Sequence, residues 1–220
     1  SDSGSNVIGY PAIAMDGSGR FVIAWIEICD QCYSYDIYAQ RYNSSGVPLG
    51  SNFKVNDDTV SAWQMYPAIA MDGDGDFIVT WEDSRNGNSD IYAQRYNSSG
   101  FALGPNFKVN DDTGTAHQIY PAIAMNSSGN FVIAWRDRRN NNIPAIYAQR
   151  YNDFSMPRGP NFKVSDDSAR VMDALPSIAM DGSGRFVITW QDYRYDSPDV
   201  YAQKYKSSGS PWGSNFLVPN

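Results

Sequence analysis

The chain has 220 residues, a net charge of −7 and 42% hydrophobic residues. The negative charge argues against a sequence-independent grip on nucleic acid, because such binding needs Lys and Arg to neutralise phosphates. No apolar run approaches the ~18 residues of a membrane span. The N-terminus lacks a basic segment followed by an apolar stretch, so we expect any signal peptide to have been removed. Fifteen Tyr, ten Phe and six Trp, with frequent Gly and Pro, favour strands and turns over helices.

The first predicted elements belong to a unit that recurs four times. The segment 10–25, YPAIAMDGSGRFVIAW, returns at 66–81, 120–135 and 175–190, and each copy is followed by versions of DIYAQRYN and NFKV. The prolines that mark each copy are 54 to 56 residues apart, at Pro11, Pro67, Pro121 and Pro176. One supersecondary unit therefore accounts for nearly the whole chain.

Each unit is predicted to form four antiparallel strands. In the first copy, Asp16 opens a hairpin turn with the sequence DGSG, and residues 43–46 open a second turn. The run that ends at Trp25 is almost continuously apolar, as expected for a strand covered on both faces. The predicted strands of this copy are residues 12–15, 21–25, 37–42 and 53–55.

Four strands per unit of about 55 residues predict an all-β, four-bladed β-propeller. A β-helix would need shorter coils, a sandwich would not repeat one pattern four times, and separate sheets would leave apolar faces exposed. We expect one domain over 1–220, closed by packing between its first and last blades through the repeated Trp25, Trp81, Trp135 and Trp190. The spacing from Pro176 through the C-terminus and on from Ser1 to Pro11 is again 55, which indicates a whole number of units. The expected blades are about 10–56, 66–110, 120–165 and 175–220.

The repeat, YPAIAMDGSGRFVIAW followed by DIYAQRYNSSG, resembles repeats in large secreted bacterial proteins of mostly unassigned function. More distantly, Asp16-x-x-Gly-x-Phe with a Trp ending the strand looks like the Asp-box turn of sialidase-type propellers, without the Ser or Thr that precedes that aspartate. The resemblance implies a propeller architecture and an exported, secreted or cell-surface location. It brings no catalytic residues, because the arginine cluster and Tyr/Glu pair of sialidase-like enzymes have no matching set in this chain.

Comparison of the copies divides the expected propeller into two faces. The hairpin turns are almost uniform, whereas the loops between second and third strands and the inter-blade linkers vary strongly. Loops on a rigid scaffold are where binding residues usually lie. Aromatic and imidazole side chains that break the repeat on the variable face are therefore candidate ligand-binding residues. They are Tyr33, Tyr35, Trp63, His117, Tyr193 and Tyr195.

A charged motif recurs on the same face. An acidic residue lies two positions after each Trp, and in three copies an arginine follows two positions later. The motif could bind a polar ligand as a ring of charge, or it could be an ion pair in each blade that orders the loop. Its members are Glu27, Asp83, Arg85, Asp137, Arg139, Asp192 and Arg194.

Calcium is a further possible ligand. Asp72, Asp74 and Asp76 place three carboxylates on alternate residues, although the downstream bidentate acid of a full calcium loop is missing. The alternative is a plain hairpin turn. Cys29 and Cys32 are expected to be a local loop disulfide or two thiols, because no helix or further zinc ligands accompany them.

These features predict a non-catalytic extracellular binding or adhesion module with a glycan or protein ligand. With His117 as the only histidine and the acidic residue of the charged motif repeating in each blade, catalysis finds little support in the sequence. One alternative is self-association into a surface layer or filament through the outer strands, although their lysines discourage edge pairing. Another alternative is a carbohydrate-active hydrolase or lyase.

Overall fold

Among the residues that the structure describes, the regular secondary structure consists of β-strands. The computed structural model describes residues 5–29, 34–166, 175–195 and 197–219. Among these residues each repeat forms one four-stranded antiparallel sheet whose strands follow in chain order. The fold is a four-bladed β-propeller, and the predicted fold class is confirmed. Closure between the first and last blades, and the single-domain organisation, stay predictions.

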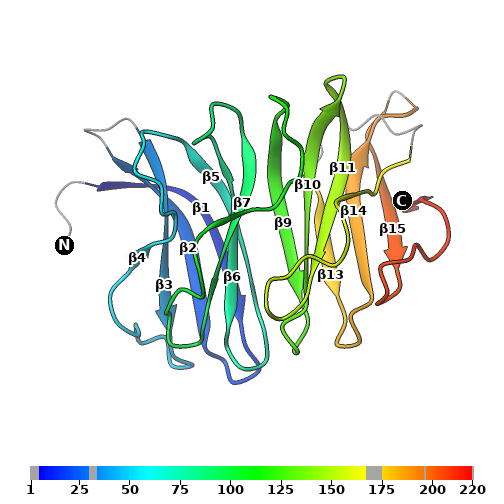
Figure 1. The fold of residues 1–220 in the computed structure, drawn as a ribbon. Helices are drawn as coiled ribbons and strands as arrows, with labels where there is room; N and C mark the ends of the chain where they lie inside the picture. The colour runs from blue at the N-terminus through cyan, green and yellow to red at the C-terminus, as the bar shows by residue number, and fades with distance from the viewer. Residues whose placement is uncertain (1–4, 30–33, 167–174, 196, 220) are drawn as a thin grey trace. The chain divides into compact units, whose positions relative to one another are not determined.

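The chain divides into two compact units, Ser1–Val109 and Asn110–Asn220. Each unit contains two blades (Figure 1). The first unit contains β1 (Ser5–Met15), β2 (Phe21–Cys29), β3 (Ser34–Tyr42), β4 (Phe53–Lys54), β5 (Gln64–Met71), β6 (Phe77–Asp83), β7 (Asp90–Tyr96) and β8 (Phe107–Lys108). The second contains β9 (Gln118–Met125), β10 (Phe131–Asn140), β11 (Ile143–Tyr151), β12 (Phe162–Lys163), β13 (Ser177–Met180), β14 (Phe186–Asp192), β15 (Asp199–Tyr205) and β16 (Phe216–Leu217).

Several inner strands are longer than the sequence predicts. β1 begins at Ser5 instead of residue 12, and its pairing with β2 shifts register between Gly9 and Ala12. Tyr10 lies in this irregular stretch with φ 53°, a backbone conformation that is uncommon for a bulky residue. Pro11 follows it and cannot donate to the sheet, so the strand continues past the proline through a bulge.

The core of each unit lies between its two blades. Successive side chains of a strand point to opposite faces, so Val22, Ala24 and Ile26 of β2 share one face. In the first unit this face packs against the blade that carries Trp81. The second unit repeats the arrangement, with Trp190 as the corresponding aromatic. Trp81 and Trp190 are thus packing surface between the two blades of their units.

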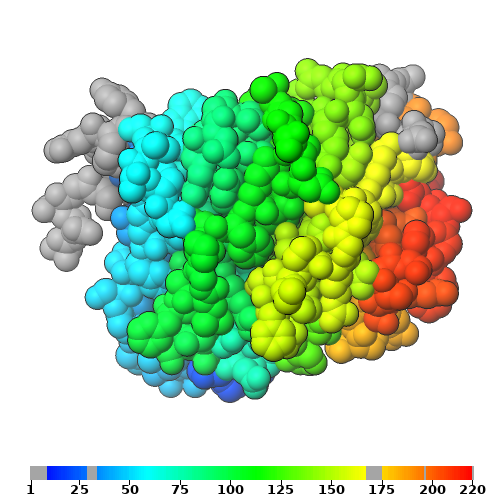
Figure 2. All heavy atoms as spheres, viewed as in Figure 1, coloured from blue at the N-terminus to red at the C-terminus, as the bar shows by residue number. Residues whose placement is uncertain are grey.

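The outer strands form short, charged edges. β4 and β8 have two residues each, and their lysines are ion-paired, Lys54 to Asp36 at 2.8 Å and Lys108 to Asp90 at 2.9 Å. The connection from β11 to β12, yellow in Figure 2, lies on the outside of its unit and exposes Phe154. Short edges with charged side chains resist pairing with another strand.

The hairpin turn of each copy is held by the side chain of its first residue. Asp16 Oδ1 accepts hydrogen bonds from the backbone N–H of Ser18 at 2.8 Å and of Arg20 at 3.0 Å. The turn closes at Gly19, whose φ of +84° suits glycine. Aspartate and glycine at these positions are the reason that the predicted turn forms.

Candidate functional site

The recurrent acidic residue of the second blade is a fully buried anchor. Asp83 is 0% exposed, and its Oδ2 accepts hydrogen bonds from Trp81 Nε1 and from Arg85 Nη2, each at 2.8 Å. Its Oδ1 accepts the backbone N–H of Arg85 at 2.9 Å. The carboxylate therefore fixes the start of the β6–β7 loop.

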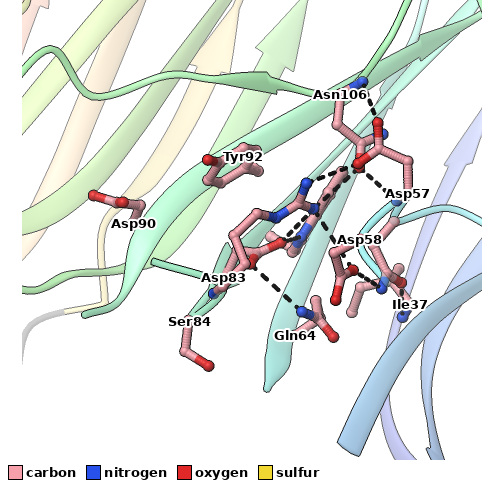
Figure 3. Close-up of polar contacts among 12 residues, drawn as sticks. Ile37, Asp57, Asp58, Gln64, Asp83, Ser84, Asp90, Tyr92 and Asn106 are labelled. Atoms are coloured by element: carbon pink, nitrogen blue, oxygen red, sulfur yellow. Dashed lines mark hydrogen bonds and ion pairs between the residues drawn. The ribbon is translucent and has the colours of Figure 1, made fainter. Parts of the chain in front are cut away.

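The arginine of the motif joins this loop to two other segments (Figure 3). Arg85 Nη1 donates to Asp57 Oδ1 at 2.7 Å, and Nη2 donates to Asn106 Oδ1 at 3.2 Å. Its guanidinium also lies 4.3 Å from the ring centroid of Tyr92. Asp57 belongs to the preceding linker and Asn106 to the outer-strand segment, so one cation ties together three parts of the unit.

The same network recurs twice in the second unit. Arg139 contacts Asp137 at 2.8 Å and Asp111 at 2.6 Å, and Arg194 contacts Asp192 at 2.7 Å. Burial by itself would lower the pKa of Arg139, but its hydrogen bonds to the two aspartates raise it above the ordinary arginine value. In the second, third and fourth blades the aspartate and arginine of the motif therefore form an ion pair that orders the loop. A ligand role for the motif stays a prediction.

The first blade follows a variant of the motif. Glu27 is 6% exposed and its Oε1 accepts a hydrogen bond from Trp25 Nε1 at 2.8 Å. Cys29 occupies the arginine position, and the Cys29–Cys32 disulfide or thiol prediction lies outside the described residues, as does the placement of Tyr33.

Two of the predicted aromatic residues meet in the first unit. The rings of Tyr35 and Trp63 lie edge to face with centroids 5.9 Å apart, and Trp63 is 57% exposed. In the second unit Tyr195 is 72% exposed, while Tyr193 is half-buried. The structure places these side chains at a surface but tests no ligand, so their binding role stays a prediction.

The aspartates proposed for calcium are parts of a turn. Asp72 Oδ1 accepts the backbone N–H of Asp74 at 3.0 Å and of Asp76 at 2.9 Å, and Asp76 Oδ2 lies 3.3 Å from Arg95 Nη2. Burial raises the pKa of Asp72, and the nearby charges of Asp76 and Asp74 add to that shift. Within the described residues no three His, Cys, Asp or Glu side chains gather into a metal-binding group. Calcium binding there remains a proposal to test.

The third blade carries an open hollow of about 790 Å³ where its linker faces the β10–β11 hairpin. Asn141 and Asn142, with φ of 51° and 64°, form the tight turn of this hairpin, whose strands are longer than those of the second blade. His117 and Arg139 also line the hollow, and they are the only two sequence-predicted binding residues among its lining side chains. The lining residues are Asp111, Asp112, Thr113, Gly114, Thr115, Ala116, His117, Arg138, Arg139, Asn141 and Asn142.

Arg138 is a lining residue that sequence reasoning missed. Ile28, Ser84 and Tyr193 occupy its position in the other copies, so it breaks the repeat. Its backbone N–H donates to the carbonyl of His117 at 3.1 Å. Its Nε is buried without a hydrogen-bond partner among the described residues. The Nε of Arg85, in the ion pair of the second blade, is buried without a partner in the same way, so this feature alone does not mark a ligand site.

Comparisons with known proteins show the fold. No protein-family model matches the chain, and no curated protein matches its sequence. Among solved structures, an α-L-arabinanase from Penicillium chrysogenum complexed with arabinobiose has 14% identity and a TM-score of 0.64 over 95% of this chain and 66% of its own. A Hadza microbial sialidase has 13% identity and a TM-score of 0.61 over 90% of this chain and 44% of its own. A Dyadobacter fermentans protein of unknown function has 13% identity and a TM-score of 0.56 over 82% of this chain and 48% of its own. The chain therefore spans less than two thirds of each of these three proteins.

These similarities correct two predictions from the sequence. Further similar structures are an endo-arabinase and two α-L-arabinofuranosidases, so the fold is shared mostly with glycoside hydrolases. The prediction of a non-catalytic binding or adhesion module is wrong, and so is the prediction that the protein is not an enzyme. The error was to treat repetition of carboxylates as evidence against catalysis. A repeated scaffold can carry one asymmetric hollow, as the third blade shows. The sialidase neighbour supports the distant sialidase resemblance, whereas the secreted repeat family is unconfirmed.

The described residues contain no helix that is long and apolar enough to cross a membrane.

Proposed function

We propose that the protein is a carbohydrate-active hydrolase that cleaves a glycan bound in the hollow of the third blade. The observation that carries this proposal is a hollow of about 790 Å³ lined by two carboxylates, Asp111 and Asp112. Its volume lies in the range of small-molecule sites. The shared fold with glycoside hydrolases supports the same class of reaction.

Glycoside hydrolysis requires one carboxylic acid to protonate the leaving oxygen and one carboxylate to act as base or nucleophile. The two aspartates have different surroundings, which such a division of roles needs. Asp111 is 47% exposed and contacts Arg139 Nη1 at 2.6 Å. Asp112 is 11% exposed and its Oδ1 accepts a hydrogen bond from Asn110 Nδ2 at 2.6 Å.

The other lining groups suit a polyhydroxylated ligand. Asn141 and Asn142 carry amides at the tip of the hairpin, and Arg138 contributes a guanidinium to the lining. Amide and guanidinium groups donate to sugar hydroxyls and ring oxygens. We further propose that the protein acts outside the cell, where polysaccharide substrates are found, as the resemblance to secreted repeats implies.

The test is hydrolysis of a panel of polysaccharides, arabinan included, measured by the release of reducing ends. The second blade offers a matched control, because Asp58 accepts a hydrogen bond from Asn56 Nδ2 at 2.5 Å just as Asp112 does from Asn110. Asp112→Asn should lower kcat roughly 100-fold or more, the usual contribution of acid–base catalysis. Asp58→Asn should leave kcat unchanged. No hydrolysis of any substrate, or equal loss in both variants, would contradict the proposal.

A further inference from the structure

The hairpin end of the second unit holds a second hollow, of about 140 Å³, between the third and fourth blades. It is separate from the loop-end hollow and shares no lining residue with it. Two arginines, Arg150 and Arg158, line it, and its described lining residues include no carboxylate. Two cations without a facing acid are unusual in a chain of net charge −7.

The positive character of this hollow comes from departures from the repeat. Asn126 stands where the other copies have Asp16, Asp72 and Asp181, so the turn has lost its carboxylate. Arg158 donates its backbone N–H to the carbonyl of Arg150, a bond that Leu49 makes to Arg41 in the first blade. An apolar position has therefore become a cation in the blade that also lost the acid.

Neither arginine is neutralised by a side chain of the described residues. Arg150 Nη2 donates to the carbonyl of Ser207 at 2.9 Å, and its Nη1 donates to the carbonyl of Ser208. Arg158 Nη2 donates to Asn130 Oδ1 at 2.9 Å. Burial, followed by repulsion from Arg158, lowers the pKa of Arg150, as expected for two uncompensated cations at close range.

A buried amide completes the set of donors. Asn126 is 8% exposed, and its Oδ1 accepts the backbone N–H of Ser128 at 3.1 Å and of Asn130 at 3.0 Å. Its Nδ2 lies toward Gly184 of the next blade, where an added Cβ would be 3.6 Å away. The amide therefore presents donor hydrogens at the lining of the hollow.

The first unit provides an internal comparison. The corresponding hollow has a volume of only about 10 Å³ and is lined by Asp16, Arg20, Arg41 and Leu49. Arg20 Nε donates to Asp16 Oδ2 at 2.6 Å, so this arginine is already ion-paired with a carboxylate of the protein. The hollow of the second unit is larger and also has two arginines, but its described lining residues include no such acid.

We propose that this hollow binds a tetrahedral oxyanion, a phosphate or sulfate group, through Arg150, Arg158 and Asn126. Guanidinium groups bind such oxyanions through charge-assisted hydrogen bonds. The volume equals the share of roughly five waters at about 30 Å³ each, which is enough for one oxyanion group and little more. The group could belong to a free ion or to a sulfated glycan, and the site is independent of the proposed hydrolytic hollow.

Calorimetric titration of the whole chain with sodium phosphate and sodium sulfate, at constant ionic strength set with chloride, tests the site. Saturable binding is expected. Arg158→Leu, which installs the residue of the first two blades, and Asn126→Asp, which restores the acid of the other copies, should each weaken binding roughly tenfold or more. Lys206→Gln removes an exposed cation nearby and should change the affinity less than twofold.

A sulfated disaccharide and its unsulfated form distinguish the two sources. Tighter binding of the sulfated sugar than of free sulfate assigns the site to a glycan, and equal binding assigns it to the free ion. Absence of saturable binding, or unchanged affinity in both Arg158→Leu and Asn126→Asp, would overturn the proposal. Hydrolysis by the loop-end hollow is measured separately, so either proposal can fail alone.

Discussion

Replacement of Arg85 by alanine tests whether the recurrent ion pair is scaffold. The change leaves the carboxylate of Asp83, which is 0% exposed, without the guanidinium that faces it at 2.8 Å. Breaking a buried pair by removing one partner costs about 3–5 kcal/mol, because an uncompensated charge stays buried. With the side chain of Arg85 only 15% exposed, we expect a loss of about 3 kcal/mol.

For a chain of this length that loss corresponds to a Tm roughly 6–12 °C lower, measured by circular dichroism or calorimetry. The Asp83→Asn/Arg85→Ala double variant should recover part of the loss, because it removes the buried charge as well. Arg185→Ala is the control, since Arg185 and Asp181 are 56% and 41% exposed and exposed pairs contribute little. A Tm for Arg85→Ala that matches the control, or a double variant less stable than Arg85→Ala, would refute the reasoning.

The remaining predictions concern charge, metal and surface. Because burial raises the pKa of Asp72 in the folded protein, this carboxyl ionises at a lower pH in the unfolded chain than in the folded one. Its ionisation therefore favours unfolding, so Asp72→Asn should raise Tm above about pH 4 and leave it unchanged in acid. Ser183 and Arg185 lower the pKa of Asp181 to about 2, so Asp181→Asn should lower Tm above about pH 4, with the loss vanishing toward pH 2. Melting curves from pH 2 to 7 check both signs, and equal signs would contradict the account. If calcium binds at Asp72, a chelator should lower Tm and added calcium restore it, whereas an unchanged Tm would remove the site. Trp63→Ala should leave Tm nearly unchanged, because the ring is 57% exposed, and should weaken glycan binding in pull-downs if Trp63 belongs to a binding surface.

The fold could be predicted because each repeat carries its own local signals. Asp16 and Gly19 specify the hairpin, and the apolar run to Trp25 specifies a strand covered on both faces. The residues at which the strands begin and end were harder to predict from the sequence. β1 continues through Pro11 with Tyr10 at a positive φ, a conformation that the propensity of tyrosine does not predict.

The sites were only partly predictable. The motif of Asp83 and Arg85 is visible as a spacing, but its partner Asn106 lies 21 residues further along the chain, and only the folded blade brings them together. Arg138 and Arg158 were visible as departures from the repeat. Their meaning depends on what surrounds them, which is the hollow beside the β10–β11 hairpin for Arg138 and, for Arg158, a lining whose described residues include no carboxylate.

The function could not be predicted from repeat symmetry. The copies share their carboxylates, so sequence comparison alone could not distinguish Asp112 from its counterpart Asp58. The two residues differ in what surrounds them, because the hairpin of Asn141 and Asn142 forms a wall of the hollow beside Asp112.

A crystal structure of the Asp112→Asn variant, soaked with an oligosaccharide that the wild-type enzyme cleaves, tests the central claim most directly. We predict density for a sugar in the hollow of the third blade, with a glycosidic oxygen beside the side chains of Asp111 and of the asparagine at position 112. Sugar density bound only elsewhere on the chain, with the hollow filled by water, would contradict the account.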